Sequence, residues 1–153
     1  MRRPTVHASA VVIGGRGVLI RGASGSGKSS LVLQMLTAGD HGSALVADDR
    51  VDLRAEGGRL MAAVPHLLAG LLEVRGHGIL RLPYVSPVAV ALVVDLRPSA
   101  DCPRMPEPDE LCVELCGVRV ARIFIASGAP DGSARVRAAL HWPLFEKAEI
   151  SAA

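Results

Sequence analysis

The alternation of apolar and polar positions predicts a chain built mainly of short strands. Apolar runs of strand length recur between clusters of glycine, proline and acidic residues, which is the pattern of strands joined by turns. We expect strands at residues 5–13, 17–21, 43–47, 51–54, 59–63 and 88–94, and two more within 111–125 that meet at Gly117. Glycines at 14–15 and 57–58 are turn sequences, so the first two strands and the fourth and fifth should pair as hairpins.

Two short helices complete the predicted elements. The first follows Ser29 and should stop near Gly39, because glycine readily adopts the left-handed conformation that ends helices. The second covers residues 134–140. Residues 97–110 carry four prolines and several acids, which indicates a surface loop, and a frayed tail is expected at 141–153.

Composition favours an α/β protein with a covered sheet. Half of the 153 residues are apolar and only 3% are aromatic, so the core must consist mainly of Val, Leu, Ile and Ala. This length fits one domain over residues 1–153, which can bury roughly two-thirds of its unfolded surface.

Charge and cysteine content argue against several classes of protein. The net charge of +2 is dispersed and no basic run alternates with aromatics, so nucleic acid is not an expected partner. No apolar stretch is long enough for a signal peptide or a membrane span, which predicts a cytoplasmic protein. Cys102, Cys112 and Cys116 form no CxxC pair, so neither disulfides nor a zinc site is expected. If 112–116 is a strand, its two thiols share one face and pack as small apolar groups.

A glycine-rich stretch carries the strongest functional signal. It reads Gly22, Ala23, Ser24, Gly25, Ser26, Gly27, Lys28 and Ser29, between a predicted strand and a predicted helix. This is the order of a P-loop, where glycines let the backbone turn so that successive N–H groups and the helix N-terminus face a phosphate. Lys28 would reach the β- and γ-phosphates of a nucleotide, and the Ser29 hydroxyl would bind Mg²⁺. The alternative is a glycine-rich turn that happens to contain Lys-Ser.

An acidic pair, Asp48-Asp49, directly follows the predicted strand 43–47. Charges at the end of a buried strand lie at the rim of the sheet, where P-loop folds place ligands of metal ions and water. The alternative is that the pair caps a helix or forms a turn.

Three further features combine with this loop into a family resemblance. His7 lies upstream of the loop, Val46-Ala47-Asp48-Asp49 follows it, and Leu72-Glu73-Val74-Arg75-Gly76-His77-Gly78-Ile79 comes next. In this order they resemble the catalytic domain of the HPr kinase/phosphorylase family, over residues 5–82. The core of that family resembles the nucleotide-binding core of phosphoenolpyruvate carboxykinase, which implies an α/β fold with a P-loop and a mixed sheet flanked by helices.

The resemblance implies an ATP- and Mg²⁺-dependent kinase. It would phosphorylate a serine of the phosphocarrier protein HPr and thereby regulate carbohydrate metabolism through the phosphotransferase system. Asp49 would accept the proton of that serine, and Asp48 would orient Asp49 or belong to the metal shell. Lys28 would neutralise the transferred phosphoryl group, and His7 would lie near the reacting phosphates.

The resemblance also implies a metal site and a loop beside it. Ser29 and Glu73 would hold Mg²⁺, because a carboxylate supplies the hard oxygen ligand that one hydroxyl cannot replace. Arg75 and Gly76 would belong to a loop that shapes the site. The family tends toward hexamers, which leaves a homo-oligomer open.

The chain departs from the family pattern in a loop near its C-terminus. Family members carry a catalytic arginine where this chain has Asp131, and replacement by Arg135 or Arg137 stays open. The family's N-terminal domain and C-terminal helices are also expected to be missing or shortened. Kinase chemistry is therefore favoured over the reverse phosphorolysis.

Two other functions remain open on the sequence alone. One is a kinase of small molecules, and the other is an ATP-sensing module without phosphoryl transfer. A GTPase switch is not favoured, because guanine recognition commonly uses an N-K-x-D motif and the chain contains no Asn.

Overall fold

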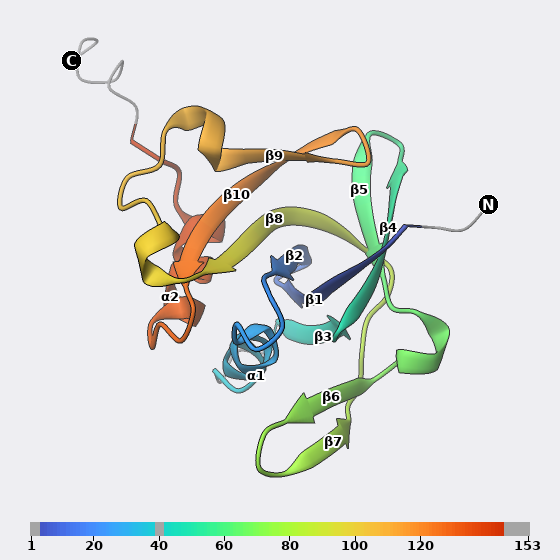
Figure 1. The fold of residues 1–153 in the computed structure, drawn as a ribbon. Helices are drawn as coiled ribbons and strands as arrows, with labels where there is room; N and C mark the ends of the chain where they lie inside the picture. The colour runs from blue at the N-terminus through green and yellow to red at the C-terminus, as the bar shows by residue number, and fades with distance from the viewer. Residues whose placement is uncertain (1–3, 39–41, 146–153) are drawn as a thin grey trace.

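The structure is a computed structural model that describes residues 4–38 and 42–145 (Figure 1). Its strands are β1 (Thr5–Ile13), β2 (Arg16–Arg21), β3 (Ser43–Ala47), β4 (Arg50–Glu56), β5 (Arg59–Ala63), β6 (Leu71–Val74), β7 (Gly78–Arg81), β8 (Val88–Arg97), β9 (Cys112–Leu115) and β10 (Val118–Ala126). Its helices are α1 (Lys28–Leu36) and α2 (Gly132–His141), with short 3-10 turns η1 (His66–Leu68), η2 (Ser99–Asp101) and η3 (Pro108–Leu111). The predicted strands, both predicted hairpins and both predicted helices are confirmed within these bounds.

Eight strands form one mixed sheet, in which β2 lies between an antiparallel and a parallel neighbour. Strand β1 runs antiparallel to β2, and β8 runs parallel to it. Strand β10 continues the parallel arrangement beside β8, and β9 pairs with β10 in antiparallel orientation. The prediction of a mixed α/β fold is therefore confirmed, and the glycine-rich stretch follows a strand that is hydrogen-bonded on both sides.

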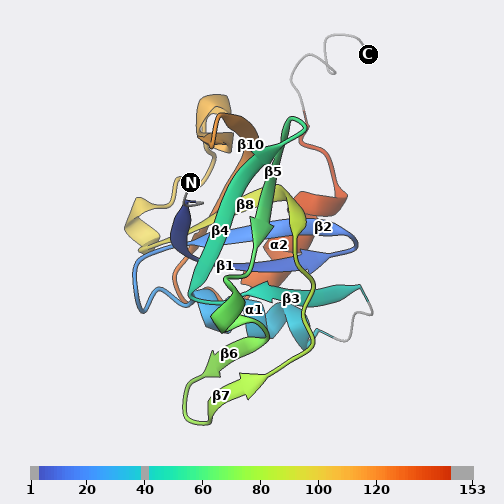
Figure 2. The ribbon, with the colours of Figure 1, turned by 90° about the vertical axis from the view of Figure 1, so that its right-hand side faces the viewer.

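Strands β1 and β8 each take part in two layers, a main layer that includes β2 and β10 and a second layer formed with β4 and β5. The C-terminal half of β1 pairs with β2 and β3, whereas its residues 5–7 pair with β4. Strand β8 pairs with β5 at its start and with β2 and β10 further along. The hairpin β4–β5 thus crosses the main layer on the face opposite the helices, nearest the viewer in Figure 2, and closes a ring of strands, β2–β1–β4–β5–β8–β2.

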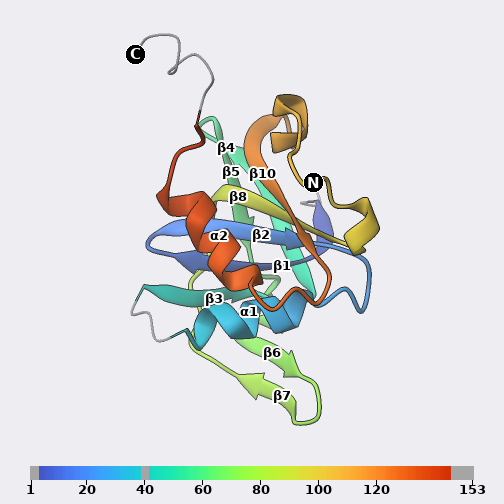
Figure 3. The same cartoon turned by 90° about the vertical axis from the view of Figure 1, so that its left-hand side faces the viewer.

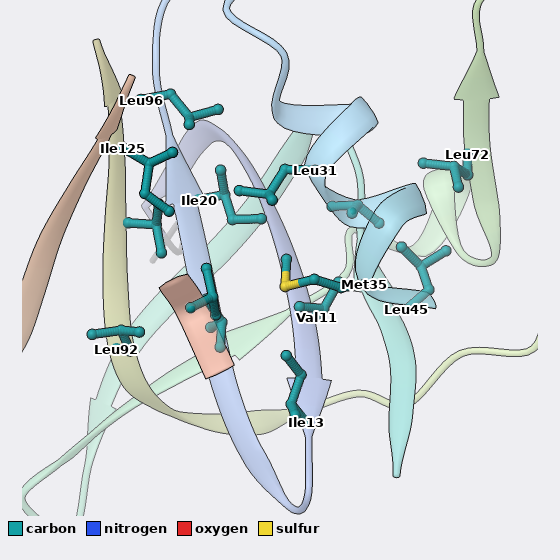
Figure 4. Packing of buried hydrophobic residues seen from close by; sticks show 14 residues of the cluster. Val11, Ile13, Ile20, Leu31, Met35, Leu45, Leu72, Leu92, Leu96 and Ile125 are labelled. Carbon is teal, nitrogen blue, oxygen red and sulfur yellow. The ribbon is translucent and has the colours of Figure 1, made fainter. Parts of the chain in front are cut away.

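The main layer has a core on each of its faces. Both helices cover one face (Figure 3), where the apolar residues of α1 pack against alternate residues of β1 and β2, such as Val11 and Ile20 (Figure 4). The opposite face packs against β4–β5 through a second cluster that includes Leu19, Leu53 and Val93. Successive residues of a strand point to opposite faces, so each central strand contributes to both cores and reads as a continuous apolar run.

The segment after β5, which the sequence pattern left undefined, forms a separate two-stranded sheet. Strands β6 and β7 pair antiparallel around a turn at residues 75–77, with Glu73 opposite Ile79. Leu72 anchors this hairpin, because its side chain is buried in the helix-side core. The hairpin carries the Leu72–Ile79 motif and projects from the main layer next to α1 (Figure 1).

The predicted surface loop 97–110 is confirmed: it follows β8, contains the short turns η2 and η3, and has no buried residue. One other local prediction was wrong. Cys116 lies beyond β9 with a positive φ of 52° and is exposed, whereas Cys112 is half-buried in the strand, so the two thiols do not share a strand face. The reason is a tight turn at 116–117, where a left-handed residue reverses the chain.

Helix ends also differ from the predictions. Helix α1 ends at Leu36, and Gly39, the residue expected to end it, lies outside the described residues. His141, the first residue of the predicted frayed tail, is the last residue of α2. The part of that tail at 146–153 lies outside the described residues.

Neither α1, with nine residues, nor α2, with ten, reaches the length and hydropathy of a membrane-crossing helix, and no other helix in the described part does.

The helix-side core predicts a large stability difference between two methionines. Met35 is fully buried between α1 and the sheet, whereas Met105 is 84% exposed. Met35→Ala should lower the free energy of unfolding by about 2–5 kcal/mol, because it removes buried methylenes and leaves a cavity. Met105→Ala should change it by less than about 0.5 kcal/mol. Urea denaturation of both variants measures the difference, and equal losses would contradict the packing described here.

Candidate functional site

A cavity of about 360 Å³ opens beside the glycine-rich loop, residues 22–27. Its wall is formed by β1, the loop with the first turn of α1, the connection between β3 and β4, and the hairpin β6–β7. The structure brings six predicted residues to this one cavity, although they are far apart in the sequence: His7, Lys28, Ser29, Asp48, Asp49 and Glu73.

The loop is shaped by two glycines that no other residue could replace without strain. A Cβ on Gly22 would collide with the Ser26 hydroxyl oxygen and lie 3.1 Å from the carbonyl oxygen of Leu96, so a side chain there would displace its neighbours. Gly27 has a φ of 100°, a left-handed conformation that glycine adopts without a steric cost. Ser24 and Gly25 face the cavity, whereas Gly22, Ala23 and Ser26 do not line it.

The Lys28 side chain is hydrogen-bonded to the backbone at the start of the glycine-rich loop. It is the first residue of α1, and its ammonium donates hydrogen bonds to the carbonyl oxygens of Gly22 at 2.8 Å and Ala23 at 3.0 Å. Burial lowers the pKa of Lys28 below its ordinary value, and the nearby carboxylates of Asp48 and Asp49 act in the opposite direction. An ammonium has three N–H donors, so one remains for a ligand in the cavity.

Asp48 connects three elements by hydrogen bonds. A bulge in β3 pairs Ala47 with Ala10 and Leu45 with Val11, so the residue between them is left without a partner on β1. The bulge changes the strand alternation and turns the Asp48 side chain to the helix side. There its carboxylate accepts hydrogen bonds from the hydroxyl of Ser9 on β1 at 2.7 Å and from the hydroxyl of Ser29 on α1 at 2.9 Å.

Asp49 occupies a different environment from its neighbour. Its backbone has a φ of 69°, and the N–H of Arg50 donates to the carbonyl of Asp48 at 2.8 Å, which makes a three-residue turn centred on Asp49. This conformation is costly for a residue with a Cβ and is typically found at functional sites. The Asp49 side chain is 68% exposed and lies 3.1 Å from Nε2 of His7. One carboxylate of the pair is thus buried and hydrogen-bonded to two hydroxyls, and the other is open to the cavity.

The hairpin β6–β7 brings Glu73 and Arg75 to the wall of the same cavity. The side chain of Leu72 points into the core, so that of Glu73 faces away from the core and lines the cavity. Arg75 lines it as well, whereas Gly76, which was expected in the same loop, does not. Within residues 4–38 and 42–145, no three His, Cys, Asp or Glu side chains form a ready metal-binding group.

Neither arginine considered as a substitute for the family's catalytic arginine lies at this cavity. Arg135 pairs with Asp131 at 2.9 Å, one turn apart on the exposed start of α2. Arg137 donates a hydrogen bond to the carbonyl of Met35 at 3.1 Å, at the far end of α1 from the loop. Arg75 is the arginine that lines the cavity.

Sequence reasoning did not identify Ser9 and Ser30, which also line the cavity. Ser9 is fully buried and is the polar residue in an otherwise apolar strand segment, two positions after His7. Alternation along a strand places positions 7, 9 and 11 on the same face, so this spacing was the signal that could have revealed it.

Comparison with known proteins adds an independent line of evidence. Residues 1–86 match the family model described as the HPr Serine kinase C-terminal domain. The chain is 39% identical over 92 residues to the HPr kinase/phosphorylase of Clostridium tetani, which is 60% of this chain and 28% of that protein. It is 36% identical over 137 residues to the HPr kinase/phosphorylase of Burkholderia lata, which is 83% of this chain and 41% of that protein.

The fold has a counterpart among solved structures. The Hpr(Ser) kinase/phosphatase of Coxiella burnetii superimposes with a TM-score of 0.75 at 27% sequence identity, over 90% of this chain and 97% of that one. The chain spans less than half of the length of the curated relatives described above.

The hydrogen bonds of Asp48 predict a role for Ser9 in stability. Ser9→Ala should lower the free energy of unfolding by about 1–3 kcal/mol, because it leaves a buried carboxylate with one donor fewer. Ser99→Ala, a change at an exposed serine of η2, should alter it by less than about 0.5 kcal/mol. Thermal denaturation of the two variants measures this, and a Ser9→Ala protein as stable as the control would refute the role of Ser9.

Proposed function

Because the chain belongs to the HPr serine kinase C-terminal domain family, we propose that it transfers the γ-phosphoryl group of ATP, with Mg²⁺, to a serine of the phosphocarrier HPr. One arrangement carries this proposal: the Lys28 ammonium, the Asp49 carboxylate and the Glu73 carboxylate face the same cavity from three separate elements. A phosphoryl transfer needs a cation for the moving charge, an acceptor for the serine proton and a ligand for the metal ion. These three side chains supply the three functions.

The glycine-rich loop would act as a P-loop for the triphosphate. It connects β2 to the N-terminus of α1, and the backbone N–H groups at such a junction favour an anion. The free donor of Lys28 would contact the transferred group. Burial disfavours the charged form of this ammonium, so an adjacent triphosphate would bind it strongly by restoring a charge partner.

Asp49 would accept the proton as the serine oxygen attacks phosphorus. Its side chain is exposed to the cavity, and His7 at 3.1 Å would hold the carboxylate in one orientation. Asp48 would not serve as the base, because its carboxylate is only 7% exposed and is engaged with the Ser9 and Ser29 hydroxyls, whereas that of Asp49 is open to the cavity. Asp48 would instead orient Ser29.

The donor set is compatible with Mg²⁺. The Ser29 hydroxyl donates its hydrogen to Asp48, so its lone pairs stay available for a metal ion, and Glu73 offers a carboxylate from the wall of the same cavity. Mg²⁺ usually retains several waters and binds few protein oxygens beside the substrate phosphates, so two protein ligands are sufficient. When bound, the ion would neutralise charge on the β- and γ-phosphates.

The fold supports the finer likeness to the phosphoenolpyruvate carboxykinase core. In a doubly wound fold the neighbours of the loop strand are parallel to it, whereas β1 is antiparallel to β2 here. We also propose that residues 1–153 act as one kinase domain in the cytoplasm, where ATP and HPr would be its substrates. Strands β8 and β10 lie outside the matched region 1–86 and still belong to the same sheet.

The role of Asp49 predicts a loss of transfer without a loss of binding. Asp49→Asn keeps the shape of the side chain and an acceptor for His7 but removes the proton acceptor. The rate of HPr phosphorylation should fall by about 100- to 10,000-fold, while the dissociation constant for Mg-ATP stays within about threefold. Transfer of labelled phosphate to HPr and calorimetry measure the two quantities.

The control for this experiment is Asp101→Asn, an exposed aspartate of η2, which should leave both quantities unchanged. Labelling that survives Asp49→Asn would remove the assignment of the base. Tight ATP binding by the unaltered chain with no transfer to HPr would indicate an ATP-sensing module. ADP release with a metabolite in place of HPr would indicate a small-molecule kinase.

The metal role of Glu73 predicts a change in the Mg²⁺ requirement. Glu73→Gln removes the charge of the proposed ligand, so the Mg²⁺ concentration for half-maximal transfer should rise about tenfold or more. Glu114→Gln, an exposed change on β9, should leave it unaltered. A Mg²⁺ titration of initial rates compares the variants, and overlapping curves for all three proteins would exclude Glu73 as a ligand.

A further inference from the structure

A second cavity, of about 100 Å³, lies on the other side of the first turn of α1. Gly27 and Ser30 line both cavities, so the two meet at the glycine-rich loop. The remaining wall of the second cavity comes from the exposed edge of α1, the ends of β8 and β10, and the loop that leads into α2.

The order of the strands fixes the direction in which a bound nucleotide would extend. Strand β2, which leads to the loop, has β1 and β3 on one side and β8 and β10 on the other. Asp49 follows β3, so the γ-phosphate would point to that side. The nucleoside end of the same molecule would then extend from the loop toward the ends of β8 and β10. The second cavity lies there, next to Leu96 and Ile125.

The second cavity is held in shape by contacts of its own loop. The Ser127 hydroxyl donates to the carbonyl of Ser26, and the Ser127 N–H donates to the carbonyl of Arg97 at 2.8 Å. These two hydrogen bonds connect the loop before α2 to the glycine-rich loop and to β8. The second cavity is therefore formed before any ligand binds.

The chemistry of the wall suits the faces of a planar ring. Leu31, Leu96 and Ile125 form an aliphatic floor with little exposed surface, because each is at most 5% exposed, and Gly27 and Gly128 line the cavity without a side chain. The described residues that line it include no acidic or basic side chain, and its polar side chains are those of Ser30 and Gln34. A glutamine amide offers both a donor and an acceptor, so it can pair with the edge of adenine or of guanine.

We propose that this second cavity receives the nucleobase of the phosphate donor and accepts adenine and guanine alike. This inference rests on the proposed function and adds the nucleobase specificity of the same nucleotide site. The main cavity would select the phosphate donor by binding its triphosphate and the metal ion. A pyrimidine buries less apolar ring surface, so it would bind more weakly than either purine.

The test is calorimetry on the full chain with Mg²⁺ and four probes: ATP, GTP, CTP and inorganic tripolyphosphate. ATP and GTP should bind within about threefold of each other, and CTP about tenfold more weakly. Ala129→Leu places a larger side chain in the second cavity, so it should weaken ATP and GTP at least about tenfold and leave tripolyphosphate within about twofold. Ala100→Leu, at an exposed position of η2, should change none of these affinities.

The outcomes separate the two proposals. If tripolyphosphate and ATP both fail to bind the unaltered chain, the phosphate site and the proposed function are overturned, and the base site with them. If both bind but Ala129→Leu leaves ATP unaffected, or GTP binds more than about thirtyfold more weakly than ATP, the base inference alone is overturned. Photo-crosslinking of 8-azido-ATP to the unaltered chain is independent of how the variant folds. Labelling within 125–132 supports the inference, and labelling confined to 43–56 refutes it.

Discussion

Asp48 accepts hydrogen bonds from two elements that the sequence places on either side of the glycine-rich loop. Ser9 fixes its carboxylate to β1, and Ser29 fixes it to the start of α1. The buried charge of Asp48 would be costly without these donors, so strand, helix and carboxylate can be stable only in one relative arrangement. The position of the loop over the sheet follows from that arrangement.

The same constraint separates the roles of two adjacent aspartates. The bulge in β3 directs Asp48 inward, and the turn centred on Asp49 directs the next side chain into the cavity. A regular strand would send consecutive side chains to opposite faces of the sheet. The unusual backbone at this point is therefore the reason that both carboxylates lie at one site.

Much of the fold could be predicted from local patterns. The alternation in 5–13 and the apolar run in 88–94 are strong strand signals, and paired glycines marked the hairpins. The β6–β7 hairpin was not predicted, because its strands have four residues each and only Leu72 is fully buried, which gives little periodicity to detect. The prediction that Cys116 shares a strand face with Cys112 was wrong, because a non-glycine residue at positive φ has no reliable sequence signature.

For the site, sequence order indicated which residues could act but gave no distances. The motifs around His7, Lys28 and Asp49 pointed to residues that the fold brings to one cavity. The partners of each aspartate could not be predicted. Asp48 is hydrogen-bonded to two hydroxyls while Asp49 is open, and this difference depends on contacts between residues about 40 positions apart, such as that between Ser9 and Asp48. Spacing alone could not decide between Arg135 and Arg137 either, since both face other partners.

The ring of strands joins the cavity to the far side of the molecule. His7 lies opposite Arg50 in the pairing of β1 with β4, and β4 is paired in turn with β5 and, through β5, with β8. A ring has no free edge at which one strand can detach alone, so loosening the rear hairpin also displaces the strand end that carries the imidazole. Intact strand pairing at the rear hairpin is thus a condition for the alignment of His7 and Asp49 at the cavity.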